Sequence, residues 1–141
     1  MKGDSIRYRR GYKYQLVNDY RCQTAIIPDC DIETELVQLD HTGLLTIRHG
    51  YAWDGPSGPT FDTPNFMRGS LIHDALAQLC RDLYIDRSTW STAINLELQK
   101  ACVEDGMSPI RAWWVFVGVE HLGGDSWLRW GDGGKKLLNA P

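Results

Sequence analysis

Hydrophobic and polar residues alternate along the first third of the chain, a pattern typical of strands with one buried face. In one stretch, aromatic and apolar residues are separated by polar ones: Tyr12, Lys13, Tyr14, Gln15 and Leu16. The stretch TELVQLDHTGLLTIRHG contains two β-type runs on either side of Asp40-His41-Thr42-Gly43. These patterns predict antiparallel strands over about residues 6–50, including a hairpin with His41 at its tip. His49 follows the hairpin, and surface roles are expected for both histidines.

Residues 51–63 interrupt this pattern with a segment rich in Pro and Gly, which disfavours regular structure. The aromatic residues Tyr51, Trp53 and Phe61 lie in the same segment and favour an ordered loop. We therefore expect a loop that connects the strands to the helical part of the chain.

Two amphipathic helices are predicted after this loop. The first covers about residues 64–83, because Thr63-Pro64 is a helix start and its apolar residues recur at helical spacing: Ile72, Leu76, Leu79 and Leu83. The second covers about residues 88–105, with Ser88 as its N-cap and Gly106 just after its end. Its apolar stripe comprises Trp90, Ile94, Leu98 and Ala101.

A third helix is predicted over about residues 109–122, between the start signal Ser108-Pro109 and the pair Gly123-Gly124. Its AWWVFVGV stretch is apolar on all sides. A helix of this length spans about 21 Å, shorter than a hydrocarbon core of about 30 Å. The pattern therefore indicates the central core helix of a three-helix bundle, and not a membrane span. Residues 131–141 are expected to form a flexible tail.

Composition supports one α+β domain over residues 1–141, with N-terminal antiparallel strands and a C-terminal three-helix bundle packed on the sheet. The 141 residues are 43% hydrophobic and 23% charged, which is typical of a folded globular protein. A net charge of −3 gives no general attraction to nucleic acid. The first residues lack the apolar segment of a signal peptide, so the cysteines are expected to be thiols: Cys22, Cys30, Cys80 and Cys102.

The candidate chemistry centres on His73 and Asp74 in the first predicted helix. His73 lies about 100° from Ile72 around the helix, on a flank of small residues that leaves room for a cleft or for the close approach of another helix. If the first two helices are antiparallel, Asn95 lies at a similar height, and a hydrogen bond between His73 and Asn95 is feasible. Asp74 lies farther round the helix, toward the Gly/Pro-rich loop.

The loop adds oxygen ligands to this region. Its backbone carbonyls, together with the carboxylates of Asp54 and Asp74, could bind calcium or another divalent metal. His73 could then serve as a general base for water. A Ser57–His73 nucleophile pair is an alternative, although Ser57 does not lie in a strand-turn-helix elbow. The structural alternative, without any catalytic role, is that His73 lies at the edge of the core and that Asp74 is a solvated acid.

Three stretches carry a resemblance to a known family: IRHGYAWDGPSGP, LIHDALAQL and INLELQKACVEDGMSPIRAWWVFVGVEHLGG. In order and spacing they resemble the phage and prophage family called domain of unknown function 1353, over about residues 12–127. The resemblance implies a phage or prophage origin, with the host cytoplasm or the virion as its location and other phage or host proteins as partners. Trp53, Ala77 and Asn95 stand where members of the family have Thr, Tyr and Asp.

The arrangement is also similar, more loosely, to the phospholipase A2 site, in which a calcium loop precedes a helical His-Asp pair. This similarity implies that His73 is the base, that Asp74 and the loop around Asp54 and Gly55 bind calcium, and that Asn95 replaces the Asp that orients the His. An Asn can hold a neutral imidazole but does not stabilise its protonated form as a carboxylate does.

Two hypotheses follow from these residues. In the first, the protein is a hydrolase, with or without a bound metal, which acts on an ester or an envelope component. Its site comprises Asp54, Ser57, His73, Asp74 and Asn95. In the second, it is a virion, assembly or host-interaction component in which Asp54 and His73 hold the loop against the helix. The departures at Ala77 and Asn95 favour the second hypothesis.

Overall fold

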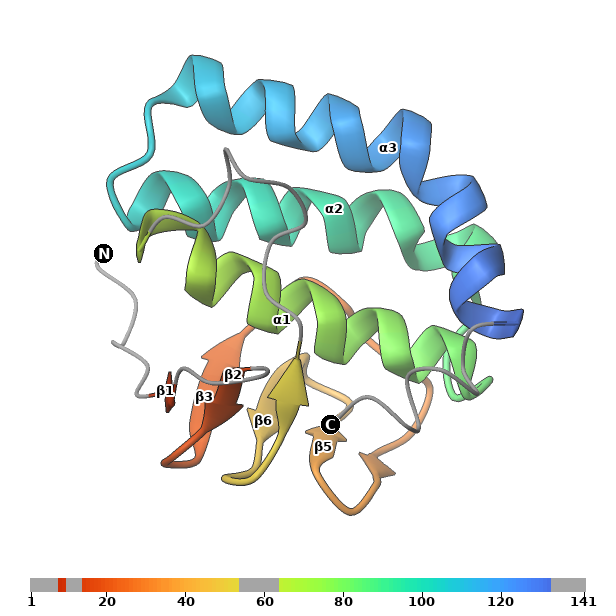
Figure 1. The fold of residues 1–141 in the computed structure, drawn as a ribbon. Coiled ribbons are helices and arrows are strands. Elements are labelled where there is room, and N and C mark those ends of the chain that lie inside the picture. Colours follow the sequence, from red (N-terminus) through yellow and green to blue (C-terminus); the bar gives the residue numbers. More distant parts are fainter. Residues whose placement is uncertain (1–7, 10–13, 54–63, 133–141) are drawn as a thin grey trace.

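The structure is a computed structural model that describes residues 8–9, 14–53 and 64–132, with side chains described for residues 14–53 and 64–121. Short antiparallel strands come first along the chain and three helices follow (Figure 1). The predicted α+β class is confirmed. Thr63, the predicted cap of the first helix, lies outside the described residues, as do residues 133–141 of the predicted tail.

The described strands form two antiparallel sheets. The three-stranded sheet has the order β1 (Tyr8–Arg9), β2 (Tyr14–Leu16) and β7 (Ala52–Trp53). The four-stranded sheet has the order β3 (Tyr20–Gln23), β6 (Leu44–Ile47), β5 (Val37–Leu39) and β4 (Ile32–Glu33). The expected hairpin is confirmed, because β5 and β6 pair with Leu39 opposite Leu45.

The turn of this hairpin needs its glycine. Gly43 has a φ of +87°, and a methyl group placed on it would lie 2.5 Å from the backbone oxygen of Thr24. Asp40 closes the turn, because its Oδ1 accepts hydrogen bonds from the backbone N–H groups of Thr42 and Leu44. The Asp-x-x-Gly pattern therefore encodes the turn directly.

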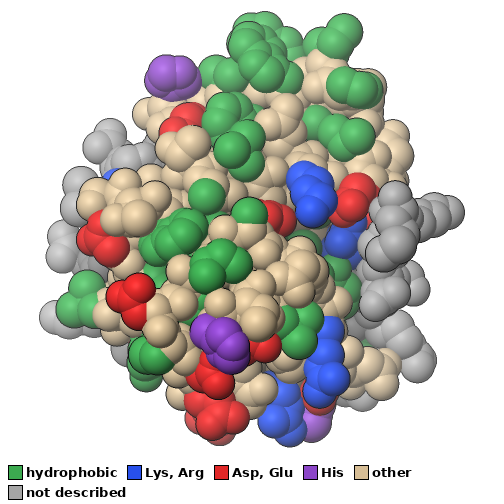
Figure 2. All heavy atoms as spheres, turned by 180° about the vertical axis from the view of Figure 1, so that it is seen from behind, with side chains coloured by type: hydrophobic (Ala, Val, Ile, Leu, Met, Phe, Trp, Pro, Cys, Tyr) green, Lys and Arg blue, Asp and Glu red, His purple; other side chains and the backbone are tan. Residues whose placement is uncertain are grey.

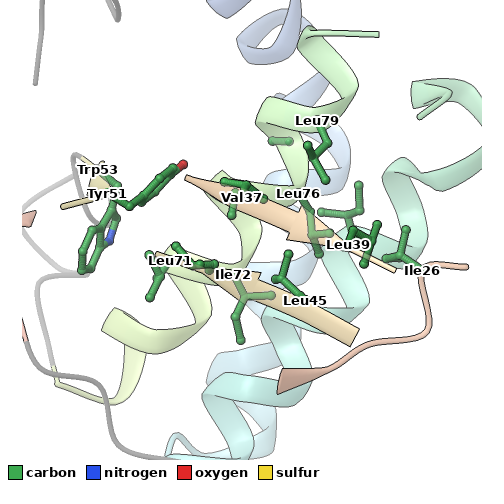
Figure 3. Close-up of a cluster of buried hydrophobic side chains, with 14 of the residues drawn as sticks. Ile26, Val37, Leu39, Leu45, Tyr51, Trp53, Leu71, Ile72, Leu76 and Leu79 are labelled. Atoms are coloured by element: carbon green, nitrogen blue, oxygen red, sulfur yellow. The ribbon is translucent and has the colours of Figure 1, made fainter. Parts of the chain in front are cut away.

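The helices are α1 (Pro64–Arg81), α2 (Arg87–Glu104) and α3 (Pro109–Asp132). They lie in successive layers above the strands, with α1 nearest the strands, α2 next and α3 outermost (Figure 1). The main core forms where α1 meets the sheet. Figure 3 shows Val37, Leu39 and Leu45 from the strands facing Leu76 of α1.

α1 ends two residues earlier than predicted, at Arg81. The backbone N–H of Tyr84 donates to the carbonyl of Leu79, and that of Leu83 donates to the carbonyl of Cys80. This is the Schellman arrangement, which requires a left-handed residue next to the helix end. Leu83 takes that position with a φ of +65°. The sequence did not reveal it, because glycine is the usual residue there.

α2 has a different N-cap from the predicted Ser88. Asp86 has an extended backbone, and its Oδ2 accepts a hydrogen bond of 2.9 Å from the backbone N–H of Thr89. Ser88 instead donates its hydroxyl to the same carboxylate. A carboxylate has more acceptor sites than a Ser hydroxyl, and its negative charge is also favoured by the helix dipole. The end predicted from Gly106 is confirmed, with Gly106 at a φ of +100°.

α3 begins as predicted, since the backbone N–H of Arg111 donates to Ser108 Oγ. It does not end at residue 122, however, and continues through Gly123 and Gly124 to Asp132. Glycine lowers helix stability by about 1 kcal/mol but retains its N–H and causes no clash, so it permits a helix to continue. Gly131 and Asp132, which were expected in the tail, are the last residues of this helix.

α3 was predicted to be the central helix of the core, and this prediction is wrong. Ala112 and Val115 are buried, whereas Ile110, Trp113 and Trp114 are exposed, Trp114 by 62%. Figure 2 shows hydrophobic side chains gathered at the top of the molecule, where α3 lies. A sequence that is apolar all round shows that every face of a helix is apolar. It does not show that the rest of the protein packs against every face. No helix in the described part of the chain has the length and apolar character to cross a membrane.

Candidate functional site

The predicted contact between His73 and Asn95 is present. His73 lies on α1 and Asn95 on α2, and the distance from His73 Nε2 to Asn95 Oδ1 is 2.8 Å. Asn95 is buried, and the His73 side chain is 14% exposed. The two helices therefore form the expected antiparallel pair and bring together residues that are far apart in the sequence.

A third helix contributes a carboxylate that was not predicted from the sequence. Glu120 of α3 accepts a 2.6 Å hydrogen bond at Oε2 from Asn95 Nδ2. Its other oxygen, Oε1, accepts a hydrogen bond from the hydroxyl of Thr92 on α2. His73, Asn95 and Glu120 thus form a continuous hydrogen-bonded chain across three helices. A signal for Glu120 was present in the sequence, because it is the first charged residue after the apolar AWWVFVGV stretch.

Asp74 is buried beside His73, with a side chain that is only 12% exposed. Its Oδ1 lies 3.8 Å from His73 Nδ1, the ring nitrogen opposite the one that faces Asn95. The alternative of a solvated acid is therefore wrong. The two nitrogens of the His73 ring have different neighbours, an amide oxygen at Nε2 and a carboxylate near Nδ1.

The start of the Gly/Pro-rich loop is held against the same helix. The buried indole of Trp53, the last residue of β7, donates from Nε1 to Ser70 Oγ at 3.1 Å. Ser70 in turn donates to the backbone oxygen of Met67. This contact attaches the end of β7 to α1 one helical turn before His73. Asp54 and Ser57, both predicted site residues, lie outside the described residues.

The small residues on the His73 flank serve helix packing. A methyl group added to Gly69 would lie 2.9 Å from Leu98 Cδ1, 3.0 Å from Cys102 Sγ and 3.2 Å from the backbone oxygen of Leu98. α2 therefore approaches α1 at Gly69 too closely for any larger side chain. Of the two alternatives for this flank, the close approach of another helix is the one found at this position.

The other described histidines with carboxylate partners lie on the surface, as predicted. His41 Nδ1 is 2.8 Å from Asp31 Oδ1, and His49 Nδ1 is 2.8 Å from Asp19 Oδ1. The hydrogen bond and the charge of Asp31 raise the pKa of His41. These pairs are exposed and far from His73 in the sequence, which makes them useful comparisons for the site.

The buried cysteines are thiols, as expected. Cys80 and Cys102 are free and buried, and burial raises the pKa of Cys80 to about 11 and that of Cys102 to about 12. Within the described ranges, no three His, Cys, Asp or Glu side chains form a group that could hold a metal ion. Asp74 is thus the one residue of the predicted metal pair whose position is described.

A second buried polar cluster surrounds Arg68 on α1. Its Nε donates to both carboxylate oxygens of Asp105, its Nη2 donates to Glu104, and its Nη1 donates to the hydroxyl of Tyr20 at 2.8 Å. Burial alone would lower the pKa of Arg68, but these partners outweigh burial and raise it. The cluster joins β3, α1 and the end of α2, which is a structural role.

Comparisons of the chain with family models, curated proteins and solved structures found no match. The interpretation of the site therefore depends on its own residues and their geometry.

Proposed function

We propose that this protein is a small hydrolase of phage or prophage type, in which His73 is the general base. The observation that carries the proposal is the hydrogen-bonded chain from His73 through Asn95 to Glu120. General bases in hydrolases are held by a second group at one ring nitrogen while the other ring nitrogen takes the proton. The looser resemblance to the phospholipase A2 site supports the same role for His73, and the resemblance to the phage family supports the phage or prophage origin.

The expected reaction is the hydrolysis of an ester. Asn95 accepts the Nε2 proton of His73, so Nδ1 carries the lone pair of the neutral ring. Nδ1 removes a proton from water as the water oxygen forms a bond to the acyl carbon. The protonated ring then returns this proton to the departing alkoxide oxygen, and the products are an acid and an alcohol. The Asp74 carboxylate near Nδ1 stabilises the protonated ring between these steps.

Glu120 supplies the negative charge that Asn95 lacks. An Asn alone does not stabilise an imidazolium, which favoured a non-enzymatic role on sequence grounds. In the structure a carboxylate lies directly behind the Asn95 amide, so negative charge is present one hydrogen bond farther from the ring. The calcium site implied by the phospholipase resemblance includes Asp54, which lies outside the described residues, and no step of the reaction above uses a metal.

The test is a turnover assay on the full chain with a chromogenic short-chain ester and with phospholipid vesicles, each with calcium and with a chelator. A positioned general base contributes about 10²- to 10⁴-fold to the rate, so His73→Gln should lower kcat by at least about 100-fold. His49→Gln is the matched control, because His49 also has a carboxylate partner but lies on the surface, and it should leave kcat unchanged. Equal turnover by wild type and His73→Gln would refute the proposal.

A second candidate is a virion or assembly component in which the same residues are a brace. The low exposure of His73 and its link to α2 and α3 favour this candidate. In that case His73→Gln lowers the melting temperature while wild type and variant hydrolyse none of the substrates. The two candidates therefore differ in whether the variant changes turnover or only stability.

A further inference from the structure

Glu120 determines the orientation of the amide next to it. An ionised carboxylate can only accept hydrogen bonds, and one oxygen of Glu120 already accepts from Thr92. The other oxygen is 2.6 Å from the Asn95 side chain, so Asn95 must present its NH2 group there. The amide oxygen of Asn95 then faces His73.

The orientation of Asn95 in turn determines which ring nitrogen of His73 carries the proton. An amide oxygen can only accept, and it lies 2.8 Å from His73 Nε2. Nε2 must therefore be the protonated nitrogen in the neutral ring. Glu120 on α3 therefore determines the tautomer of His73, although two hydrogen bonds separate it from the imidazole.

We propose that Glu120 is a positioning residue that, acting through Asn95, holds His73 in the Nε2–H tautomer. The tautomer follows from the hydrogen-bond geometry alone, whereas its effect on rate depends on the proposed hydrolase function. In this tautomer the lone pair is on Nδ1, the nitrogen that lies toward Asp74. The opposite tautomer would place a proton on Nδ1 and leave no base on that side of the ring.

The replacement Glu120→Gln tests this role with little change in size. A Gln side chain has one accepting and one donating end, so it can present either end to Asn95. When it presents its NH2 group, Asn95 turns over and donates to His73, which favours the Nδ1–H tautomer. We therefore expect the wild-type preference to be lost. Thr92→Val is the matched control, because it removes one hydrogen bond to Glu120 but retains the carboxylate that Asn95 faces.

The first measurement is long-range ¹H–¹⁵N correlation NMR of the ¹⁵N-labelled full chain at about pH 9, where an ordinary His with a pKa of about 6.5 is neutral. His73 should be the Nε2–H tautomer in wild type and in Thr92→Val, and a mixture in Glu120→Gln. His41 and His49 are internal references, because the opposite tautomer is expected for both. Each has Nδ1 next to a carboxylate, so both should be Nδ1–H in all three proteins.

The second measurement is turnover with the ester used for His73→Gln. Glu120→Gln should lower kcat by the factor by which the Nε2–H population falls, about twofold for an equal mixture, with little change in KM, because a misplaced proton removes the base and not the binding site. An Nδ1–H ring in wild type, or an unchanged Nε2–H ring in Glu120→Gln, overturns the positioning role even if His73 proves catalytic. Conversely, the expected tautomers in a protein without esterase activity support the positioning role and refute only the hydrolase.

Discussion

The buried side chain of Arg68 offers a quantitative test of the fold. Its guanidinium group donates to Asp105, Glu104 and Tyr20 and is nearly inaccessible to solvent, with its side chain 6% exposed. Arg68→Met keeps most of the apolar stem but removes every donor. Two carboxylates and a buried hydroxyl then lose their partner at once.

The expected loss of stability follows from this geometry. Removing one partner of a fully buried ion pair costs about 3–5 kcal/mol. The carboxylates of Glu104 and Asp105 are 27% and 20% exposed, so water can partly replace Arg68 and the cost is at the low end of that range. The Tyr20 hydroxyl adds about 1 kcal/mol for a lost partner. We therefore expect Arg68→Met to lower the free energy of unfolding by about 4 kcal/mol.

Urea denaturation followed by circular dichroism measures this loss. With an m-value of about 2 kcal/mol/M, the midpoint should fall by about 2 M without a change in m. Arg48→Met is the matched control, because Arg48 pairs with Asp19 at 3.4 Å with both side chains about 40% exposed. An exposed pair contributes about 0–1 kcal/mol. The reasoning fails if Arg68→Met and Arg48→Met shift the midpoint by the same amount.

Two further predictions concern caps and surface pairs. Asp86→Ala should lower the melting temperature more than Ser88→Ala does, because Asp86 is the N-cap of α2 and Ser88 only donates to it; equal shifts in calorimetry would contradict this. The Asp31–His41 pair should make the stability of the protein depend on pH both in the acidic range and above pH 6.5. The hydrogen bonds from His41 lower the pKa of Asp31 below 3.8, so this stabilisation is present above that value and is lost as pH falls through the lowered pKa. The raised pKa of His41 gives stabilisation that is present below 6.5 and is lost as pH rises through the raised pKa. In Asp31→Asn the melting temperature should change less with pH in both ranges. A melting temperature that depends on pH as in wild type would contradict this explanation.

Local signals in the sequence predicted much of the fold. The hairpin turn, the strands described before residue 50 and the starts and ends set by Ser108 and Gly106 were correct, because each depends on residues that are adjacent in the chain. The bounds of the loop predicted over residues 51–63 were wrong at its start, because Ala52–Trp53 form strand β7. The errors at Leu83 and Ser88 have different causes. Leu83 is an unusual residue at a left-handed position after a helix, whereas Asp86 is as common an N-cap as Ser88, and only the hydrogen bonds of the folded chain identify which of the two caps α2.

The candidate site was predicted in part. The contact between His73 and Asn95 followed from helical geometry and an antiparallel pair, which need only local information. Glu120 could not be assigned in the same way, because its contribution depends on how α3 lies on α2. The sequence placed α3 in the centre of the core, and in the structure it is the outer layer.

The outer position of α3 has a consequence for the native-state dynamics of the protein. The main hydrophobic core of the described residues contains side chains from the strands, α1 and α2 but none from α3. α3 belongs to a separate, smaller cluster with Leu98, Cys102 and Met107. A partial opening that detaches α3 therefore removes Glu120 from Asn95 and leaves the main core folded. Amide hydrogen exchange in α3 should then be faster than in α1, and the same opening would set the fraction of molecules in which His73 is correctly oriented.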